Sequence, residues 1–390
     1  MDSSDLEDIL SAVRRFVRDV VIPAESEIEE TDEVPARLRE QAAAMGLFGF
    51  AIPERYGGLG LSVSEEVRLA FELGYASPAF RSMFGTNNGI AGHVLLEGGT
   101  EEQRKRFLPR LASGEWVASF GLTEAEAGSD PGALATVAVR DGGEWVIDGS
   151  KRYITNAPLA DVFMIFARTT PGVPPGKGIS VFCVPGNAPG LTVGPRDKKM
   201  GQAGAWTADV RLDGVRVPGD ALIGEAPGTG YATAMRCLAH GRLHIAAVCV
   251  GLAQRLVDES VAWATTRRQG GGPIAGHQLV QGMLADSQAE LMAGRGLVLE
   301  AARAFDAGED TTMGPACAKY FCSEMVGRVA DRAVQIHGGA GYMRGVPVER
   351  LYRDARLFRI YEGTSQIQQL VIARQLTRGR RPPASPEAAR

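Results

Sequence analysis

Cysteines are scarce in this sequence, and none has the spacing of a metal or redox motif. The 390 residues include five, Cys183, Cys237, Cys249, Cys317 and Cys322, and each lies in an apolar run. Disulfide scaffolds and zinc sites need cysteines in close or regular pairs, so both classes are disfavoured. We expect free, buried thiols in a protein of the reducing cytoplasm.

A basic excess and long apolar runs are also missing. The formal net charge is −4 and the pI is near 5.9, whereas proteins that bind nucleic acids normally carry an excess of Lys and Arg. No run approaches the ~18 apolar residues of a membrane span. The acidic N-terminus lacks the basic and apolar parts of a signal peptide. We therefore expect a cytoplasmic protein that binds neither nucleic acid nor membranes.

The common catalytic and metal-binding motifs are absent as well. The sequence contains no Gly-x-Ser-x-Gly elbow and no Walker loop. His240 and His244 stand four residues apart on one expected helix, but no Glu or Asp lies close to them in the sequence. We expect hydrogen-bonded histidines there rather than metal ligands, and no metal site.

The composition that remains is that of a globular protein with two or three domains. Hydrophobic residues make up 45% and charged residues 23%. Periodicity divides the chain into helical residues 1–116, β-rich residues 117–225, helical residues 226–378 and an arginine- and proline-rich tail, 379–390, that we expect to be disordered. The predicted fold is α+β, with an N-terminal helical domain, a middle antiparallel β barrel or sandwich, and a C-terminal four-helix bundle.

Local signals support these divisions. Pro35 should begin a helix that Gly46 ends, and Thr100 begins a capping box in which Gln103 reaches back. Long helices are predicted over 231–263, 278–305 and 315–336. Strands are predicted over 145–147, 162–166, 179–184 and 210–217, with turns at 141–143, 148–149 and 213–214. Because no helical crossover separates the strands, we expect antiparallel pairing.

One carboxylate near the C-terminus is the leading catalytic candidate. Residues 360–366 read Ile-Tyr-Glu-Gly-Thr-Ser-Gln, so Glu362 comes directly before a strong helix start. Backbone N–H groups point outward there and can bind an oxygen that gains negative charge, while the turn holds a base in place. The alternative is an ordinary surface acid at a helix N-terminus.

Two glycine-containing segments could approach a ligand closely. Residues 121–130 contain the hydroxyls of Thr123 and Ser129 and a possible N–H nest around Gly128; the alternative is a solvated acidic turn. Residues 335–342 read Gln-Ile-His-Gly-Gly-Ala-Gly-Tyr and could admit a phosphate or ribose; the alternative is a helix C-cap. No βαβ unit surrounds this second segment, so it is not a Rossmann fingerprint.

Taken in order, these segments resemble the acyl-CoA dehydrogenase family of flavoproteins over nearly the whole chain. The resemblance rests on motifs at 121–133, 151–157, 335–342, 353–356 and 361–366. It implies FAD between the β domain and the C-terminal bundle, and Glu362 as the base that removes the α-proton of an acyl thioester. The β-hydride would pass to the flavin, giving a trans-2-enoyl thioester, and the electrons would pass to electron-transfer flavoprotein.

The resemblance also implies roles for individual residues. Those expected at the flavin of the same chain are Phe120, Leu122, Thr123, Ser129, Tyr153, Thr155, Thr364 and Gln366. Those expected to reach the FAD of a neighbouring subunit are Arg267 and Gln278 at its ADP part, and Gln335, Gly338 and Gly339 at its pyrophosphate. Those expected at the substrate are Ser129, Arg242 and Gly363. Shared FAD sites imply a homotetramer built as a dimer of dimers.

Several positions depart from the family pattern. One branch of the family has its glutamate before the arginine on the first long C-terminal helix, where this chain has Gly241, so the base is assigned to Glu362. Gly270 replaces an aromatic residue near the adenine, and Ala239 and Gly345 replace usual acids. A dehydrogenase for carrier-protein-bound acyl groups, an oxidase that uses O₂, and a DNA-associated flavoprotein with little activity remain alternatives.

Overall fold

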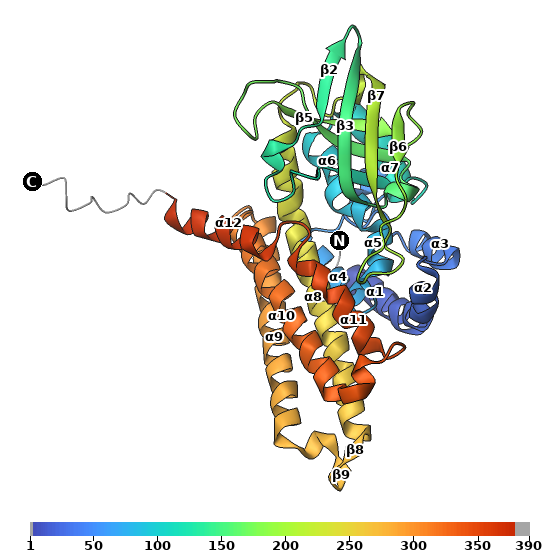
Figure 1. Ribbon diagram of the computed structural model, residues 1–390, viewed down its shortest axis with the longest axis vertical. Helices are drawn as coiled ribbons and strands as arrows, with labels where there is room; N and C mark the ends of the chain where they lie inside the picture. Colours follow the sequence, from blue (N-terminus) through green and yellow to red (C-terminus); the bar gives the residue numbers. More distant parts are fainter. Residues whose placement is uncertain (1–2, 379–390) are drawn as a thin grey trace, which may run out of the picture.

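The structure is a computed structural model that describes residues 3–378. Three regions follow one another along the chain, a set of helices, a β-sheet and a bundle of long helices, and they pack into one body (Figure 1). The predicted disorder of 379–390 concerns residues outside the described range.

The N-terminal region is helical, as predicted. Pro35 precedes a helix that Gly46 follows in a left-handed conformation, and both halves of the capping box at Thr100 and Gln103 are formed. Apolar residues at helical spacing, such as Leu6, Leu10 and Val13, are buried. The α-helices are α1 (Ser3–Phe16), α2 (Glu25–Thr31), α3 (Ala36–Ala44), α4 (Val63–Leu73), α5 (Pro78–Asn88), α6 (Ile90–Gly98) and α7 (Glu101–Ala112).

The middle region forms one seven-stranded sheet. Its order is β1-β4-β2-β3-β7-β6, and β5 pairs with β4. The predicted strand segments all lie in strands of this sheet. The strands are β1 (Ala118–Gly121), β2 (Val137–Asp141), β3 (Glu144–Thr155), β4 (Val162–Arg168), β5 (Ile179–Pro185), β6 (Leu191–Val193) and β7 (Thr207–Pro218).

The expectation of wholly antiparallel pairing is wrong for β1. This strand pairs with β4 in parallel, from Ala118 opposite Val162 to Gly121 opposite Ile165. Parallel neighbours need a crossover, and here the β2–β3 hairpin provides it in place of a helix. The absence of helices between the strands was therefore not sufficient to exclude a parallel pair.

Two of the three predicted turns are the two sides of one bulge inside long strands. Asp148 lies within β3 and Gly214 within β7, where the pairing register shifts, and the Gly214 N–H donates to Asp148 Oδ1 at 2.6 Å. The glycines supply the unusual backbone angles that a bulge needs, so the strands bend without ending. The third prediction is confirmed: Gly142 and Gly143 link β2 to β3 in a two-residue hairpin.

The C-terminal region contains the three long helices predicted. α8 runs from the β-sheet to the opposite end of the molecule, where a small hairpin joins it to α9 (Figure 1). α4 packs against both α8 and α9, so the N-terminal region contributes to the core of the bundle. The elements are α8 (Gly230–Thr266), β8 (Arg268–Gln269), β9 (Gly272–Pro273), α9 (Gln278–Asp306), α10 (Met313–His337), α11 (Pro347–Ala355) and α12 (Ser365–Thr377).

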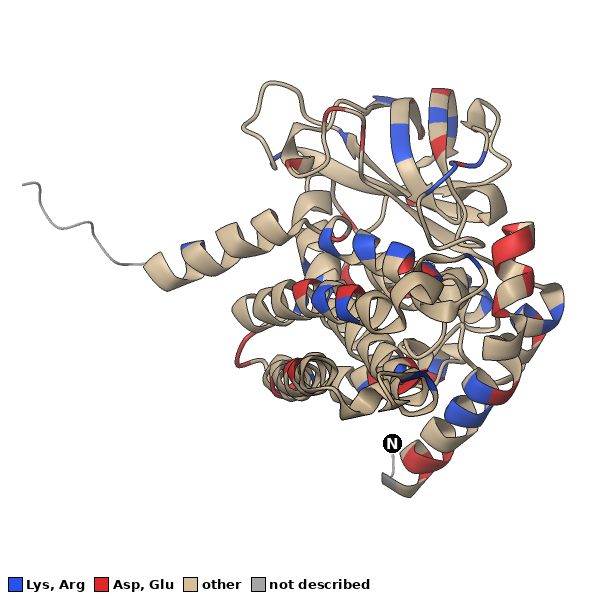
Figure 2. Ribbon diagram, turned by 60° about the horizontal axis from the view of Figure 1, so that its bottom comes forward, with Lys and Arg blue, Asp and Glu red and all other residues tan. Residues whose placement is uncertain are grey.

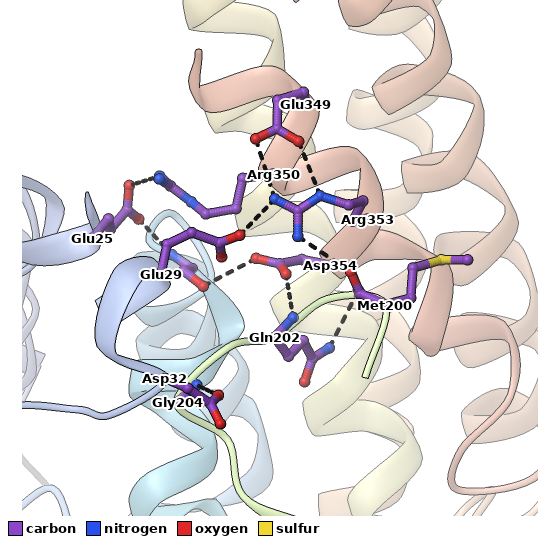
Figure 3. Close-up of polar contacts among 11 residues, drawn as sticks. Glu25, Glu29, Asp32, Met200, Gln202, Gly204, Glu349, Arg350, Arg353 and Asp354 are labelled. Atoms are coloured by element: carbon purple, nitrogen blue, oxygen red, sulfur yellow. Dashed lines mark hydrogen bonds and ion pairs between the residues drawn. The ribbon is translucent and has the colours of Figure 1, made fainter. Parts of the chain in front are cut away.

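A buried polar junction connects all three regions (Figure 3). Glu25 of α2 accepts from Arg350 of α11 at 2.5 Å and from the Ser77 N–H at 2.6 Å. Asp354 of α11 accepts from the Ser77 hydroxyl at 3.0 Å and from the N–H of Gln202, which lies between β6 and β7. The junction fixes the Gln202 segment, which reaches the cavity described next.

Charged residues do not gather into a basic stretch in the view of Figure 2. Lys and Arg alternate with Asp and Glu along the helices, as expected for a net charge of −4. α12 extends from the body with few charged residues.

Candidate active site

A cavity of about 670 Å³ lies where the β-sheet, α5, α8 and the start of α12 meet. It brings together residues far apart in the sequence. The predicted site residues that line it are Phe120, Leu122, Thr123, Ser129, Tyr153, Thr155, Arg242, Glu362 and Gly363.

The turn before α12 holds Glu362 in a left-handed conformation. The φ angle of Glu362 is 53° and that of Gly363 is 89°, and a positive φ is unusual for a residue other than glycine. Thr364 then caps α12, because its hydroxyl accepts from the Ile367 N–H at 3.2 Å. The predicted tight turn and helix start are both confirmed.

Two residues not identified from the sequence fix this turn. Lys319 of α10 is fully buried and donates from Nζ to the Gly363 carbonyl at 2.6 Å. Gln368 Nε2 donates to the carbonyls of Glu362 and Gly363 at 3.2 and 3.0 Å. With both carbonyls bonded, the backbone has little freedom to move the carboxylate. Only the tertiary structure brings Lys319 to the turn.

The carboxylate itself is set up to act as a base. Its Oε2 is buried and has no hydrogen-bond partner among the described residues. Burial raises the pKa of Glu362 above its ordinary value, and Arg81, Lys319 and Arg242 oppose that rise. A carboxylate with an unused oxygen and a raised pKa is available to take a proton from a bound molecule.

Gly241 makes room for this carboxylate. A Cβ at position 241 would lie 2.3 Å from Glu362 Oε2, so any larger residue would displace the acid. Position 241, which the resemblance gives as an alternative place for a base, therefore faces the Glu362 carboxylate, and this chain has no side chain there.

The loop after β1 is anchored by a buried ion pair. Glu124 accepts from Lys151 Nζ at 2.6 Å, from the Ala135 N–H at 2.6 Å and from both the N–H and the hydroxyl of Thr136. The interpretation of 121–130 as a solvated acidic turn is therefore wrong at Glu124. The anchored loop places Thr123 and Ser129 at the cavity wall.

The end of β3 lies beside this loop, because the Arg152 N–H donates to the Thr123 carbonyl at 2.8 Å. Tyr153 has a φ of 57° and is 60% exposed, and Asn156 follows with a φ of 62°. The Asn156 amide donates to the Ser82 carbonyl at 3.0 Å and to the Thr86 hydroxyl at 2.9 Å. These bonds tie the end of β3 to α5, which also lines the cavity.

The remaining predicted cofactor residues do not line the cavity. Thr364 caps α12 and Gln366 is exposed on it. Arg267 is 25 residues beyond Arg242 on α8, roughly 37 Å along a helix. The others that lie away are Gln278, at the start of α9, and Gln335, Gly338 and Gly339, at the end of α10.

Gly270 is explained by a turn rather than by a lost aromatic residue. Gly270 and Gly271 join β8 to β9 with φ angles of 61° and 92°. A two-residue hairpin with two positive φ angles favours glycine, so Phe at position 270 would be strained. We therefore do not expect an aromatic substitution there to improve binding.

The two histidines of α8 are hydrogen-bonded, as expected, and their partner is an acid that lies far from them in the sequence. Glu66 of α4 contacts both His240 and His244 at 2.7 Å, and all three are buried. Arg81 completes this group and lines the cavity. The only signal in the sequence was a glutamate on the apolar face of a helix.

Within residues 3–378, no helix is long and apolar enough to cross a membrane. In the same range, no three His, Cys, Asp or Glu side chains come together as ligands for a metal ion.

Comparisons with known proteins agree with this geometry. The family models for the N-terminal, middle and C-terminal domains of acyl-CoA dehydrogenase match residues 3–115, 119–215 and 228–377. An acyl-CoA dehydrogenase of Bacillus subtilis is 39% identical over 94% of this chain and 96% of its own length. A subunit of the caffeyl-CoA reductase–Etf complex of Acetobacterium woodii is 39% identical over 90% of this chain and 92% of its own length.

A solved structure agrees as well. A glutaryl-CoA dehydrogenase of Mycobacterium smegmatis in complex with FADH2 superposes with a TM-score of 0.89 and 29% identity, over 97% of this chain and 95% of that one. Three matching domains, full-length relatives and a carboxylate at the cavity lead to one conclusion. The chain belongs to the acyl-CoA dehydrogenase family of oxidoreductases.

Proposed function

We propose that this protein removes two hydrogens from the α and β carbons of an acyl thioester, with FAD as its cofactor and electron-transfer flavoprotein as electron acceptor. The observation that carries the proposal is the Glu362 carboxylate, whose buried and unpartnered Oε2 belongs to the wall of a 670 Å³ cavity. The chemical products would be a trans-2-enoyl thioester and a reduced cofactor.

The residues around the cavity fit a flavin. The anchored loop offers Thr123 and Ser129, and the end of β3 offers Tyr153 and Thr155. Hydroxyls and backbone groups beside apolar side chains suit a planar ring with a polar edge. When bound, FAD supplies the acceptor for the hydride from the β-carbon.

Glu362 takes the α-proton in this scheme. A carboxylate with an ordinary pKa is a weak base for a carbon acid, and burial raises the pKa of Glu362. The N–H of Glu362 has no acceptor among the described residues, so it can donate to the thioester carbonyl as negative charge develops there. One turn thus provides both the base and an oxyanion donor.

Replacing Glu362 tests the proposal. Glu362→Gln keeps the size and the backbone contacts of the residue but removes the base, so we expect FAD to be retained and flavin bleaching by acyl-CoA to fall by at least ~10³-fold. Anaerobic stopped-flow absorbance with acyl-CoAs from C4 to long and branched chains, and with acyl-carrier proteins, measures this. Bleaching at the normal rate in the variant would place the base elsewhere.

The electron acceptor is testable separately. The Acetobacterium relative belongs to an Etf complex, which supports electron-transfer flavoprotein here. We expect turnover with that acceptor or with a dye, and little with O₂ alone. Equal rates with O₂ would instead indicate an oxidase.

The residues that lie far from the cavity support an assembly with shared sites. Arg267 and Gln278 cannot reach a ligand in the cavity of their own chain across ~37 Å of helix, but they can reach one in a neighbouring copy. α12 exposes Leu370 and Leu376 by half or more, as expected for a contact between subunits. We propose a homotetramer in which subunits share FAD sites.

A further inference from the structure

The buried Glu66 carboxylate of α4 contacts two histidines of α8, His240 and His244. Its Oε1 contacts His244 Nδ1 and its Oε2 contacts His240 Nε2, both at 2.7 Å. With one histidine on each oxygen, the carboxylate cannot rotate without losing a hydrogen bond. Burial acts to raise the pKa of Glu66, but the two histidines lower it below the ordinary value, so the side chain is an anion.

The tautomer of His244 follows from its two partners. Arg81 Nε carries a hydrogen and donates to His244 Nε2 at 2.7 Å, so that ring nitrogen must be unprotonated. The hydrogen of the neutral ring is therefore on Nδ1, where it is donated to Glu66. Burial and the Arg81 charge lower the pKa of His244 to about 4, which agrees with a neutral ring. Phe50 stacks on the ring at 5.7 Å and fixes its plane.

This chain of bonds ends at the wall of the cavity. Arg81 lines the cavity together with Glu362, and its guanidinium packs against Gly85, where a Cβ would lie 2.8 Å from Arg81 Cζ. Arg81, Lys319, Arg242 and His240 all act on Glu362 through positive charge, and they differ in their attachment. His240 is bonded to Glu66, which raises the pKa of that ring against the effect of burial. Lys319 is bonded to a carbonyl of the Glu362 turn, whereas Arg81 depends on His244 for its position.

We propose that Glu66 and His244 are positioning residues that hold Arg81 as a fixed cation facing the catalytic carboxylate. The anion sets the tautomer of His244, and His244 sets the direction of the guanidinium. This positioning role rests on the proposed function in one respect, because it takes Glu362 to be the catalytic base.

The other titratable groups near this cluster do not hold His244 and Arg81 in place. His93 of α6 stacks on His240 at 3.9 Å, but burial lowers the pKa of His93 to about 3, so it adds no charge near neutral pH. Glu97 of α6 interacts with His240 only through its charge. On α10 and α8, Lys319 and Arg242 face Glu362, and neither is bonded to His244.

Substitutions of His244 test whether this residue positions Arg81 or only packs in the core. His244→Leu removes the acceptor for Arg81, so the guanidinium can turn away and the pKa of Glu362 should rise. At pH values below that pKa, flavin bleaching should fall by on the order of tenfold, and it should recover at high pH. His244→Gln can accept from Arg81 and donate to Glu66, so it should restore most of the wild-type pH profile.

Tyr75→Phe is the matched control. The Tyr75 hydroxyl donates to Asp258 of α8 at 2.7 Å, so this variant also removes a side-chain bond between the N-terminal helices and α8, but away from the cavity. We expect it to lower stability without moving the pH profile. If the pH dependence of flavin bleaching is also unchanged in His244→Leu, His244 has only a structural role and the proposal is overturned.

A measurement without turnover tests the tautomer directly. The chain has five histidines, so ¹⁵N-histidine NMR of the holoprotein can be assigned by substitution. We expect His244 to be neutral, with hydrogen on Nδ1, from pH 8 to pH 5. Hydrogen on Nε2 would refute the link to Arg81. A confirmed tautomer together with an unaffected Glu362→Gln variant would instead reject the proposed function and leave this geometry intact.

Discussion

At the scale of single residues, the position of the carboxylate is decided by what surrounds it rather than by its own side chain. Lys319 and Gln368 hold the two carbonyls of the turn, and Gly241 leaves the space that the carboxylate fills. The strained φ of Glu362 persists because these contacts maintain it.

Gly241→Ala tests the importance of this space. Alanine favours a helix over glycine by ~1 kcal/mol, yet its Cβ would lie 2.3 Å from Glu362 Oε2. We expect the base to be displaced and flavin bleaching to fall by on the order of 10²-fold, with FAD retained. Gly296→Ala on α9 is the control, because a Cβ there meets no atom within 4 Å. A normal rate in Gly241→Ala would show that the carboxylate can act from another position.

At the scale of elements, the polar junction of Figure 3 connects helices and a loop that come from all three regions of the chain. It joins α2, α11 and the Gln202 segment, so the sheet and the bundle keep a fixed relation on either side of the cavity. Burial raises the pKa of Asp354 in this junction to about 6. Its contribution to stability must therefore depend on pH.

The sign of that dependence can be worked out. Asp354 has an ordinary pKa of 3.8 when the chain is unfolded, so between pH 3.8 and about 6 the folded protein retains a proton that the unfolded chain has lost. Its stabilising contribution is complete below pH 3.8 and is lost as pH rises through 6, by about 3 kcal/mol.

Asp354→Asn should remove this dependence. The free energy of unfolding of the variant relative to wild type should rise by up to about 3 kcal/mol between pH 4 and pH 7, as measured by urea unfolding. Asp8→Asn, an exposed carboxylate on α1, is the control. A constant difference between variant and wild type across this pH range would mean that Asp354 is ionised throughout.

At the scale of the whole molecule, the long helices separate residues that the proposed function requires at one cofactor. The α8 residues that line the cavity lie in the first half of this helix. The β8–β9 hairpin lies at its other end (Figure 1). A single chain cannot bring Arg267 to its own cavity, so a complete site would need two copies.

Mixed oligomers test this sharing. Chains with Glu362→Gln and chains with Arg267→Ala are coexpressed and purified together by two tags, then assayed at limiting FAD. If Arg267 serves the neighbouring cavity, a mixed dimer has one site with both changes and one with neither, so random mixing restores about a quarter of wild-type sites. No recovery beyond the sum of the single variants would place Arg267 and Glu362 in the same site.

Helices and caps could be predicted from the sequence because their signals are local. The capping box at Thr100, the turn at Pro35 and the helix start after Glu362 each depend on residues within four positions of one another. The bulge at Asp148 and Gly214 was predicted as two turns because the same residue types favour turns and bulges, and only the pairing with the partner strand distinguishes them.

Residues of the candidate site could be predicted from the sequence where they belong to a family motif. The resemblance named nine residues that line the cavity, but it did not identify Arg81, Lys319 or Glu66. These three lie far along the chain from Glu362, and none belongs to a motif. A buried charge is recognised by its partners, and the partners come from other elements.

By itself, the sequence determined the three regions, the long C-terminal helices, four of the seven strands of the sheet and the carboxylate at a helix start, because each follows from composition and spacing over a few residues. Only the tertiary structure decided the parallel pairing of β1 with β4, the partner of the two histidines and the cations around Glu362. The physical reason is that strand pairing and buried polar contacts join residues distant in the chain, which are selected by packing and charge in three dimensions rather than by local propensity.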